Sequence, residues 1–304
     1  MARDVGKELI GNGASPSNPT TTLAAALEAL RLRTPARLLV GRAGTSYRTE
    51  TQLLLREDHA AAVDAVQAEL DLTRDLGAEL VARFGLFEVA TAAADKAQFL
   101  QRPELGRMLS DQARVTLAQK CTSGVDLQVA IGDGLSAAAV TSQVPALLPL
   151  LEAGAKQRGW TFGQPFVIRH CRVGVLNDLG AALDPAVVVV LIGERPGLAS
   201  AESLSAYMAF RPRPGHTDAE RNLISNIHAR GIDPRAAAER ILALAEQMMR
   251  AQSSGVAIKE RLPTIGAMGM PGIQGPLQSP SVQSPDDPAA KRRHGISLGR
   301  EPQE

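Results

Sequence analysis

A buried-strand pattern occupies Ala186-Val187-Val188-Val189-Val190-Leu191-Ile192, and it runs directly into Gly193-Glu194-Arg195-Pro196-Gly197. The apolar run shows no polar alternation, so we expect both faces of the strand to be covered, as in a parallel sheet flanked by helices. At its end we expect Glu194 and Arg195 to form an ion pair before a turn. Open α/β sheets bind ligands just beyond the carboxyl ends of their strands, so this pair marks a candidate ligand site.

The composition is that of a globular protein without a dominant charge. The chain has 304 residues, 44% of them hydrophobic, so it can bury a full core in one large domain or two small ones. Its 33 basic and 32 acidic residues leave a net charge of +1, and aromatic residues make up only 3%. Without a positive field or many stacking side chains, no nucleic-acid partner is expected.

The cysteines and the first residues bear on the compartment. Cys121 and Cys171 lie far apart without zinc-ligand spacing, which favours a reduced cytoplasmic location and argues against a metal site. Residues 1–7 carry charges where a signal peptide needs an apolar run, and no segment reaches the length of a membrane span. We therefore expect a soluble protein, without secretion and without a membrane partner.

The chain divides into three regions by composition. Residues 1–21 are predicted to be a flexible leader, because residues 11–19 are small and cannot build a core. Residues 22–262 alternate helix and strand patterns, as expected of repeated strand-helix units. From there on prolines recur among Gly, Ser and Gln without an aromatic residue, so residues 263–304 are predicted to be a disordered Pro-rich tail.

The central region predicts an α/β fold with a Rossmann-like, mostly parallel sheet flanked by helices. A capping-box pattern at Thr49-Glu50-Thr51-Gln52 starts one predicted helix, and Asp233-Pro234 starts another. The predicted strands are residues 125–131, which a helix through Leu151 follows, then 165–169, 172–176, 186–192, and an edge strand at 207–210 bounded by Pro212 and Pro214.

A glycine motif follows the strand at 125–131. Gly132-Asp133-Gly134-Leu135-Ser136-Ala137 matches the G-x-G-x-x-A variant of the dinucleotide fingerprint, between a strand and a helix. That fingerprint also expects an acidic residue at the end of the next strand, which here ends in Arg169-His170. We favour a structural interpretation, in which Asp133 or Ser136 caps a helix and the glycines make the turn.

Three further polar clusters are candidates for chemistry. The loop after Arg195 is dense in hydrogen-bonding groups, which favours a ligand-lining role: Ser200, Glu202, Ser203 and Ser205. In residues 225–228, between predicted helical segments, no carboxylate at a fixed spacing orients His228, so we expect a hydrogen-bonded structural histidine. His170 and Cys171 would point to opposite faces of a strand, so no thiolate pair is expected.

Six short motifs occur in order along the central region: Gly41-Arg42-Ala43-Gly44; Asp95-Lys96 with Leu100-Gln101-Arg102-Pro103-Glu104-Leu105-Gly106-Arg107; Asp133-Gly134-Leu135-Ser136; Gly193-Glu194-Arg195-Pro196-Gly197-Leu198; Glu202-Ser203-Leu204-Ser205; and Ile224-Ser225-Asn226-Ile227-His228. Together they resemble the small subunit of ethanolamine ammonia-lyase. The similarity covers roughly residues 35–262, and the predicted leader and tail lie outside it.

The resemblance implies that this chain is one part of a heteromeric enzyme. Members of that family use adenosylcobalamin to convert ethanolamine to acetaldehyde and ammonia by a radical mechanism, in which the protein binds and orients the cofactor. The cofactor lies between a large barrel subunit, which carries the substrate pocket, and the small α/β subunit. The resemblance therefore implies a large-subunit partner in a higher-order heteromer and no catalytic residue on this chain. It also implies a cytoplasmic location, in some organisms within a bacterial microcompartment.

Three cobalamin contacts carry over from the family by resemblance. They fall at Val173, in the predicted strand 172–176, and at Glu194, where a carboxylate can accept hydrogen bonds from the amide arms of the corrin. The third contact is a cysteine two residues before Ser-Asn-Ile-His, and Leu223 stands there in this chain. That excludes a role specific to a thiol and leaves a main-chain or packing contact.

Two functions from different classes remain on the sequence. The first is a cobalamin-binding subunit of a radical lyase. The second is a self-contained NAD(P)-dependent oxidoreductase that uses the Gly132 and Gly134 loop. A relative that keeps the interface but has lost activity is a third reading, to which only Leu223 points.

Overall fold

The computed structural model describes residues 25–30, 41–196 and 201–260. The chain separates into two compact units, Met1–Leu262 and Pro263–Glu304, and the second lies outside the described residues. The predicted leader at 1–21 and the predicted tail at 263–304 also lie outside them, so both stay predictions. Within the described ranges, no helix combines the length and the apolar character needed to cross a bilayer.

One six-stranded mixed sheet forms the centre of the first unit. Its order is β3-β5-β4-β6-β7-β8, with bounds β3 (Glu88–Ala90), β4 (Leu127–Gly132), β5 (Phe166–Arg169), β6 (Val187–Gly193), β7 (Leu204–Phe210) and β8 (Asn222–Ile227). The first four strands in this order pair in parallel, and β7 and β8 add two antiparallel pairings. A separate two-stranded ribbon joins β1 (Arg42–Ala43) to β2 (Ser46–Tyr47).

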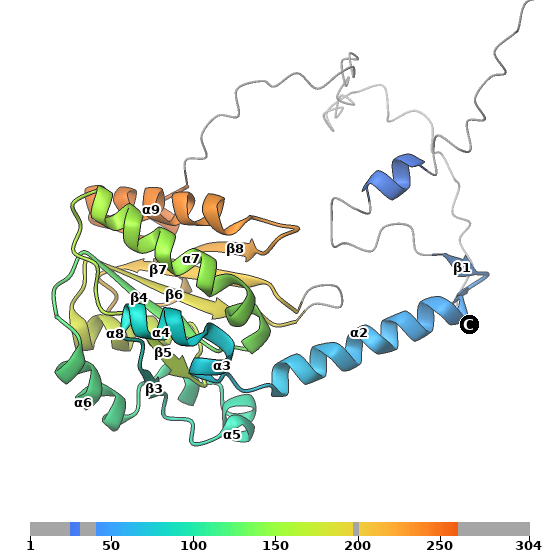
Figure 1. Ribbon diagram of the computed structural model, residues 1–304, viewed down its shortest axis with the longest axis horizontal. Helices are drawn as coiled ribbons and strands as arrows, with labels where there is room; N and C mark the ends of the chain where they lie inside the picture. The colour runs from blue at the N-terminus through green and yellow to red at the C-terminus, as the bar shows by residue number, and fades with distance from the viewer. Residues whose placement is uncertain (1–24, 31–40, 197–200, 261–304) are drawn as a thin grey trace, which may run out of the picture. The chain divides into compact units, whose positions relative to one another are not determined.

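Helices cover both faces of this sheet. Their bounds are α2 (Thr49–Gln67), α3 (Leu72–Leu76), α4 (Ala78–Phe84), α5 (Lys96–Gln101), α6 (Asp111–Lys120), α7 (Ala137–Gln157), α8 (Val175–Leu183) and α9 (Pro234–Ala251), and residues 25–30 are also helical. Short 3-10 turns lie at Leu105–Arg107, Asp218–Glu220 and Gly255–Ala257. Helices α7 and α9 lie on one face, and α6 and α8 lie on the other (Figure 1).

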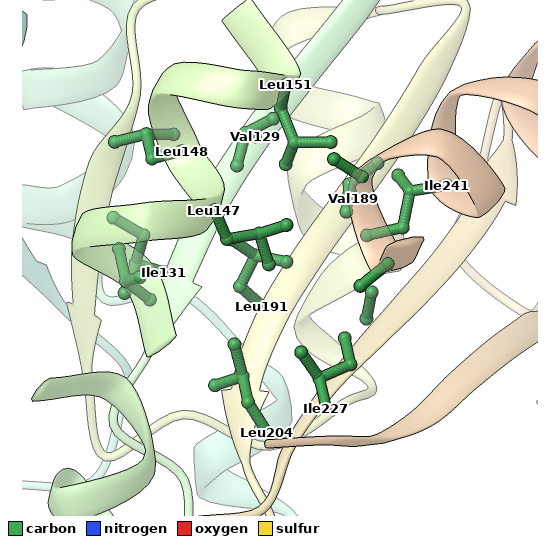
Figure 2. Packing of buried hydrophobic residues seen from close by; sticks show 14 of the residues in the cluster. Val129, Ile131, Leu147, Leu148, Leu151, Val189, Leu191, Leu204, Ile227 and Ile241 are labelled. Carbon is green, nitrogen blue, oxygen red and sulfur yellow. The ribbon is translucent and has the colours of Figure 1, made fainter. Parts of the chain in front are cut away.

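Strand β6 is buried along its whole length, as its apolar run predicted. It lies between β4 and β7, and its side chains alternate between two hydrophobic clusters. Val189 and Leu191 pack with Leu147 of α7 and Ile241 of α9 (Figure 2). Val188 and its alternate neighbours pack on the opposite face, against α8. Two helical layers therefore explain why this strand needs no polar residue.

The expectation of a mostly parallel sheet was wrong, because the chain reverses after β6. Only residues 194–203 separate β6 from β7. A parallel return needs a crossover of a dozen or more residues, usually a helix, so ten residues can only bring the chain back antiparallel. The β6–β7 pairing then runs in register from Val187 with Phe210 to Gly193 with Leu204.

Two predicted strands also differ from the structure. Residues 172–176 form a turn and the first residues of α8, and α8 buries Val175, Leu176, Leu179 and Leu183 at helical spacing. The valines of this segment therefore do not alternate along a strand: Val173 lies in the turn, and Val175 begins the buried stripe of α8. Residues 207–210 are the end of the longer strand β7, which is internal because β8 pairs with its outer side. The two prolines follow β7 and do not border an open edge.

Two local predictions at element ends were also wrong. The helix at 49–67 begins at Thr49, and its N-cap Arg48 makes no side-chain capping bond, so the capping-box pattern is not used. Residues 225–227 lie in strand β8 and not between helices. Strands β4 and β5 and helices α7 and α9 were predicted correctly, and the prediction for α9 included its start at Pro234.

The start of α9 offers a direct test of local stability. The Asp233 carboxylate accepts the backbone N–H groups of Arg235 and Ala236, at 3.0 and 3.1 Å. We expect Asp233→Ala to lower the free energy of unfolding by about 1 kcal/mol, because the cap is lost, and Asp233→Asn to keep most of it. Urea unfolding of the two variants checks this. Equal midpoints would show that the cap contributes nothing.

Candidate cofactor site

The carboxyl ends of β4, β5 and β6 meet at one edge of the sheet. Gly132 at the end of β4 is in register with Ile168 of β5 and with Ile192 of β6. The segments that follow these ends carry Asp133, Arg172 and Glu194. Ligand sites in open α/β sheets lie at this kind of edge, so the three segments form the candidate site.

Asp133 fastens the end of β5 to the end of β4. Its side chain is buried, with 4% of the residue exposed. One carboxylate oxygen accepts the backbone N–H of His170 at 2.9 Å, and the other accepts that of Cys171 at 2.8 Å. Burial raises the pKa of Asp133, although both N–H groups favour the charged form. This carboxylate therefore fixes the backbone that leads into Arg172 and Val173.

The glycine motif is accounted for by packing and capping. Ser136 caps α7 by accepting the N–H of Ala139 at 3.2 Å, as the structural interpretation predicted. Gly134 has φ +57°, and a Cβ atom there would lie 2.3 Å from the carbonyl oxygen of Gly193. Asp133 caps the end of β5 and not a helix. Each feature that resembled a dinucleotide fingerprint therefore has a role inside the fold.

Val173 and Glu194 line the same cavity. It has a volume of about 140 Å³, and it is lined by Leu135, Arg172, Val173, Glu194, Arg195 and Tyr207 among others. Val173 lies in the turn before α8, half-buried against the cluster beneath that helix. Glu194 is the first residue after β6 and is also half-buried. The two residues named by resemblance thus come from different strand ends and meet at one hollow.

Glu194 interacts with a tyrosine and not with its neighbour in the sequence. The expected ion pair with Arg195 is absent, although both residues are described. The hydroxyl of Tyr207 donates to the Glu194 carboxylate at 3.4 Å, and burial together with this carboxylate raises the pKa of Tyr207 to about 12. The backbone N–H of Glu194 donates to Ser203 at 3.1 Å. Glu194 is therefore held at a defined position, with carboxylate oxygens left to accept further hydrogen bonds.

Leu223 lies one strand away from this cavity. It is in β8, its partner in the register is Tyr207 of β7, and 45% of its surface is exposed. Paired residues of adjacent strands share a face of the sheet, so Leu223 extends the same surface beyond Tyr207. The structure brings Val173 and Glu194 together directly and leaves Leu223 at the margin.

The two histidines considered on the sequence are structural. His228 donates to the side-chain oxygen of Asn226 at 2.7 Å and accepts the N–H of Arg230 at 3.2 Å, and its burial lowers its pKa. His170 stacks on Phe99 and is bonded through Nδ1 to a backbone carbonyl. Burial raises the pKa of the Cys171 thiol well above its usual range. A protonated thiol fits the expectation that no thiolate pair forms here.

The sequence did not indicate Arg107, Arg172 and Tyr207 as site residues. Arg172 lines the small cavity and two larger ones beside it. One has a volume of about 690 Å³ and is also lined by Arg107, and the other, about 380 Å³, is also lined by Val63 of α2. Arg107 ended one of the quoted sequence motifs and Arg172 began the predicted strand at 172–176, but nothing local marked their side chains. Tyr207 carried no signal, because only the β6–β7 pairing brings it beside Glu194.

Comparison with known proteins shows the family of this chain. Residues 24–259 match the family model described as ethanolamine ammonia-lyase light chain. The chain is 39% identical over 230 residues to the ethanolamine ammonia-lyase small subunit of Clostridium perfringens, which is 76% of each chain. It is 40% identical over 227 residues to that of Fusobacterium nucleatum, 75% of each chain. For the Clostridium acetobutylicum small subunit the identity is 36% over 233 residues, 77% of this chain and 94% of that one. The chain therefore belongs to the ethanolamine ammonia-lyase light chain family, the small subunits of that lyase.

Proposed function

We propose that this chain binds adenosylcobalamin against the large subunit of ethanolamine ammonia-lyase, in a complex that converts ethanolamine to acetaldehyde and ammonia. The observation that supports this most is the shared cavity. Val173, which the resemblance selected, and Glu194, which both the strand-end pattern and the resemblance selected, line one hollow at the carboxyl edge of the sheet. We also propose that the complex is a higher-order heteromer in the cytoplasm or in a microcompartment.

The side chains at this edge suit a ligand rich in amides. In our proposal the Glu194 carboxylate accepts hydrogen bonds from corrin amide arms, while Tyr207 keeps that carboxylate in place. The turn at Val173 offers backbone groups, and Leu223 offers an apolar contact at the margin. When bound, adenosylcobalamin supplies the radical chemistry, so this chain has to bind and orient it. Residues that contact ethanolamine are expected on the large subunit.

Reconstitution tests the activity. The chain is combined with the large subunit, and acetaldehyde formation from ethanolamine is measured with and without adenosylcobalamin. We expect turnover only when both subunits and the cofactor are present. Nicotinamide-dependent turnover by the isolated chain would support the oxidoreductase alternative instead, and a complex that forms but binds no cobalamin would refute the proposal.

Glu194→Ala tests the binding role directly. We expect the Kd of the complex for cobalamin to rise about tenfold, because hydrogen bonds to a charged acceptor are lost. The free energy of unfolding should change by less than about 0.5 kcal/mol, since Glu194 makes no ion pair to a described residue. Glu239→Ala, on the exposed side of α9, is the matched control. If Glu194→Ala unfolds the chain while the remaining folded protein keeps its affinity, Glu194 is structural.

A further inference from the structure

Three arginines lie at the cavity that Val173 and Glu194 line or at the larger cavity beside it. Arg172 and Arg195 line it directly, and Arg107 lines the larger cavity that shares Arg172 and Val173 with it. These residues come from the 3-10 turn Leu105–Arg107, the segment after β5 and the segment after β6. Three separate parts of the chain therefore place arginines at two adjoining cavities that share Arg172 and Val173.

Contacts with the backbone hold Arg107 and Arg172 in position. The N–H of Arg172 donates to the carbonyl of Gly106 at 2.8 Å. A Cβ atom on Gly106 would lie 2.6 Å from Cγ of Arg172, and one on Gly174 would lie 2.8 Å from Cγ of Arg107. Each arginine stem thus lies against a glycine of the opposite segment. The guanidinium of Arg172 also lies over the Phe99 ring, 4.3 Å from its centroid.

The three arginines at this place lack an ion-pair partner within the described residues. No carboxylate there forms an ion pair with Arg107, Arg172 or Arg195. Asp178 and Asp218, which line the larger cavity, pair with Arg114 and Arg221, whereas Glu194, which lines the small cavity, accepts from the neutral hydroxyl of Tyr207.

Arg172 has a donor without an acceptor. Its Nη2 donates to the carbonyl of Phe99 at 3.3 Å, but its Nε is buried and has no hydrogen-bond partner. Burial and the like charges of Arg195 and Arg107 lower its pKa, so the three groups repel one another as they stand. The attraction of Asp133 offsets this repulsion only in part. An anion would satisfy the buried donor and relieve the remaining repulsion.

We propose that Arg107, Arg172 and Arg195 form a phosphate subsite that takes the phosphodiester of the cobalamin nucleotide loop. This rests on the proposed function, because it names which part of that cofactor the site holds. The corrin carries neutral amide arms, so the phosphodiester is the anionic group along its periphery. Arginine suits it, since a guanidinium donates two parallel hydrogen bonds to phosphate oxygens. Glu194 then faces amides while the arginines face the phosphate.

Cobalamin fragments separate this subsite from the rest of the site. Cobinamide carries the corrin and its amide arms without phosphate or base, and cobinamide phosphate adds the phosphate alone. The complex of this chain with the large subunit is dialysed against each, and bound corrin is read from its absorbance. We expect cobinamide phosphate to bind at least about tenfold more tightly than cobinamide, as a charge-assisted contact predicts.

Variants locate the effect. Arg172→Gln, Arg107→Gln and Arg195→Gln should each reduce the preference for the phosphorylated fragment several-fold, and Arg172→Lys should keep more of it than Arg172→Gln. Arg107 and Arg195 are exposed, so their variants keep the test valid if Arg172→Gln fails to fold. Arg83→Gln, which removes an exposed arginine paired with Glu152, is the control. Glu194→Ala should weaken both fragments and leave their ratio unchanged.

Two results would overturn the subsite. One is a preference for cobinamide phosphate that the arginine variants leave intact. The other is dissociation of the large subunit from those variants, which would show that the arginines pair with carboxylates of the partner. If the unsubstituted complex binds neither fragment nor cobalamin, the proposed function itself fails, and this outcome differs from both.

Discussion

Gly134→Ala is expected to lower the free energy of unfolding by about 2 to 5 kcal/mol, which combines left-handed backbone strain with overpacking. Gly134 has φ +57°, where a side chain is disfavoured. An added Cβ would also lie 2.3 Å from the Gly193 carbonyl oxygen and 2.7 Å from a side-chain carbon of Ile192. The ends of β4 and β6 would have to separate to accept it.

Two further glycine variants separate the backbone strain from the overpacking. Gly159 has φ +72° with no atom near the added Cβ, so Gly159→Ala should cost only the backbone strain, about 1 to 2 kcal/mol. Gly193→Ala adds a Cβ 2.0 Å from the Ser136 carbonyl oxygen without left-handed strain, so it reports collision alone. Urea unfolding of the three variants measures the loss of unfolding free energy in each. If Gly134→Ala costs no more than Gly159→Ala, the two strand ends are not tightly packed.

The contact of Gly134 with Gly193 also bears on the proposed cofactor site. Glu194 follows Gly193 directly, so any separation of β6 from the β4 turn displaces the carboxylate that faces the cavity. The folded fraction of Gly193→Ala should therefore bind cobalamin less tightly than the unsubstituted chain in the complex. Gly159→Ala, placed beyond the C-terminal end of α7, should leave that affinity unchanged.

The buried layers of the fold could be predicted because their chemistry is local. An unbroken apolar run such as that of β6 requires other elements to cover both faces of the strand. The start of the long helix α9 is indicated by Asp233, which caps it, and by Pro234 in its first turn. Strand β8 could not be found this way. Only Ile224 and Ile227 of that strand are buried, a spacing of three that does not resemble strand alternation. A register shift opposite Leu204 and Ala206 accompanies this spacing.

The site was predictable in its position but not in its contacts. The end of β6 indicated the carboxyl edge of the sheet and Glu194, and the family resemblance selected Glu194 again and added Val173 and Leu223. The pairing of Glu194 with Tyr207 depends on an antiparallel strand that no sequence pattern near Glu194 requires. The place of Arg172 beside Arg107 depends on a backbone bond between segments more than sixty residues apart. Long-range pairing decides such contacts, and a single sequence contains no local signal for it.

Asp133→Ala is expected to cost about 3 kcal/mol, because two buried N–H groups lose their acceptor at once. Those groups belong to His170 and Cys171. Because Asp133 is only 4% exposed, solvent water does not readily take the place of its carboxylate as their acceptor. The backbone before Arg172 and Val173 would be released, so cobalamin affinity should fall as well. Asp133→Asn retains one acceptor oxygen in the same shape and should cost less. Equal losses for both variants would show that the shape with a single acceptor oxygen is not enough and that both carboxylate oxygens are needed.

The pH dependence of the Asp133→Asn comparison follows from the direction of the pKa shift. Burial raises the pKa of Asp133 above its usual 3.8, so the folded chain holds this proton more tightly than the unfolded chain. The contribution of Asp133 to the free energy of unfolding is then greatest at low pH and falls as the pH rises from 3.8 through the folded-state value. Asparagine has no proton to lose, so the advantage of the natural residue should shrink over that range. Lys96 and His170 attract the carboxylate and limit the change, and an advantage that grows with pH would mean that their attraction outweighs burial.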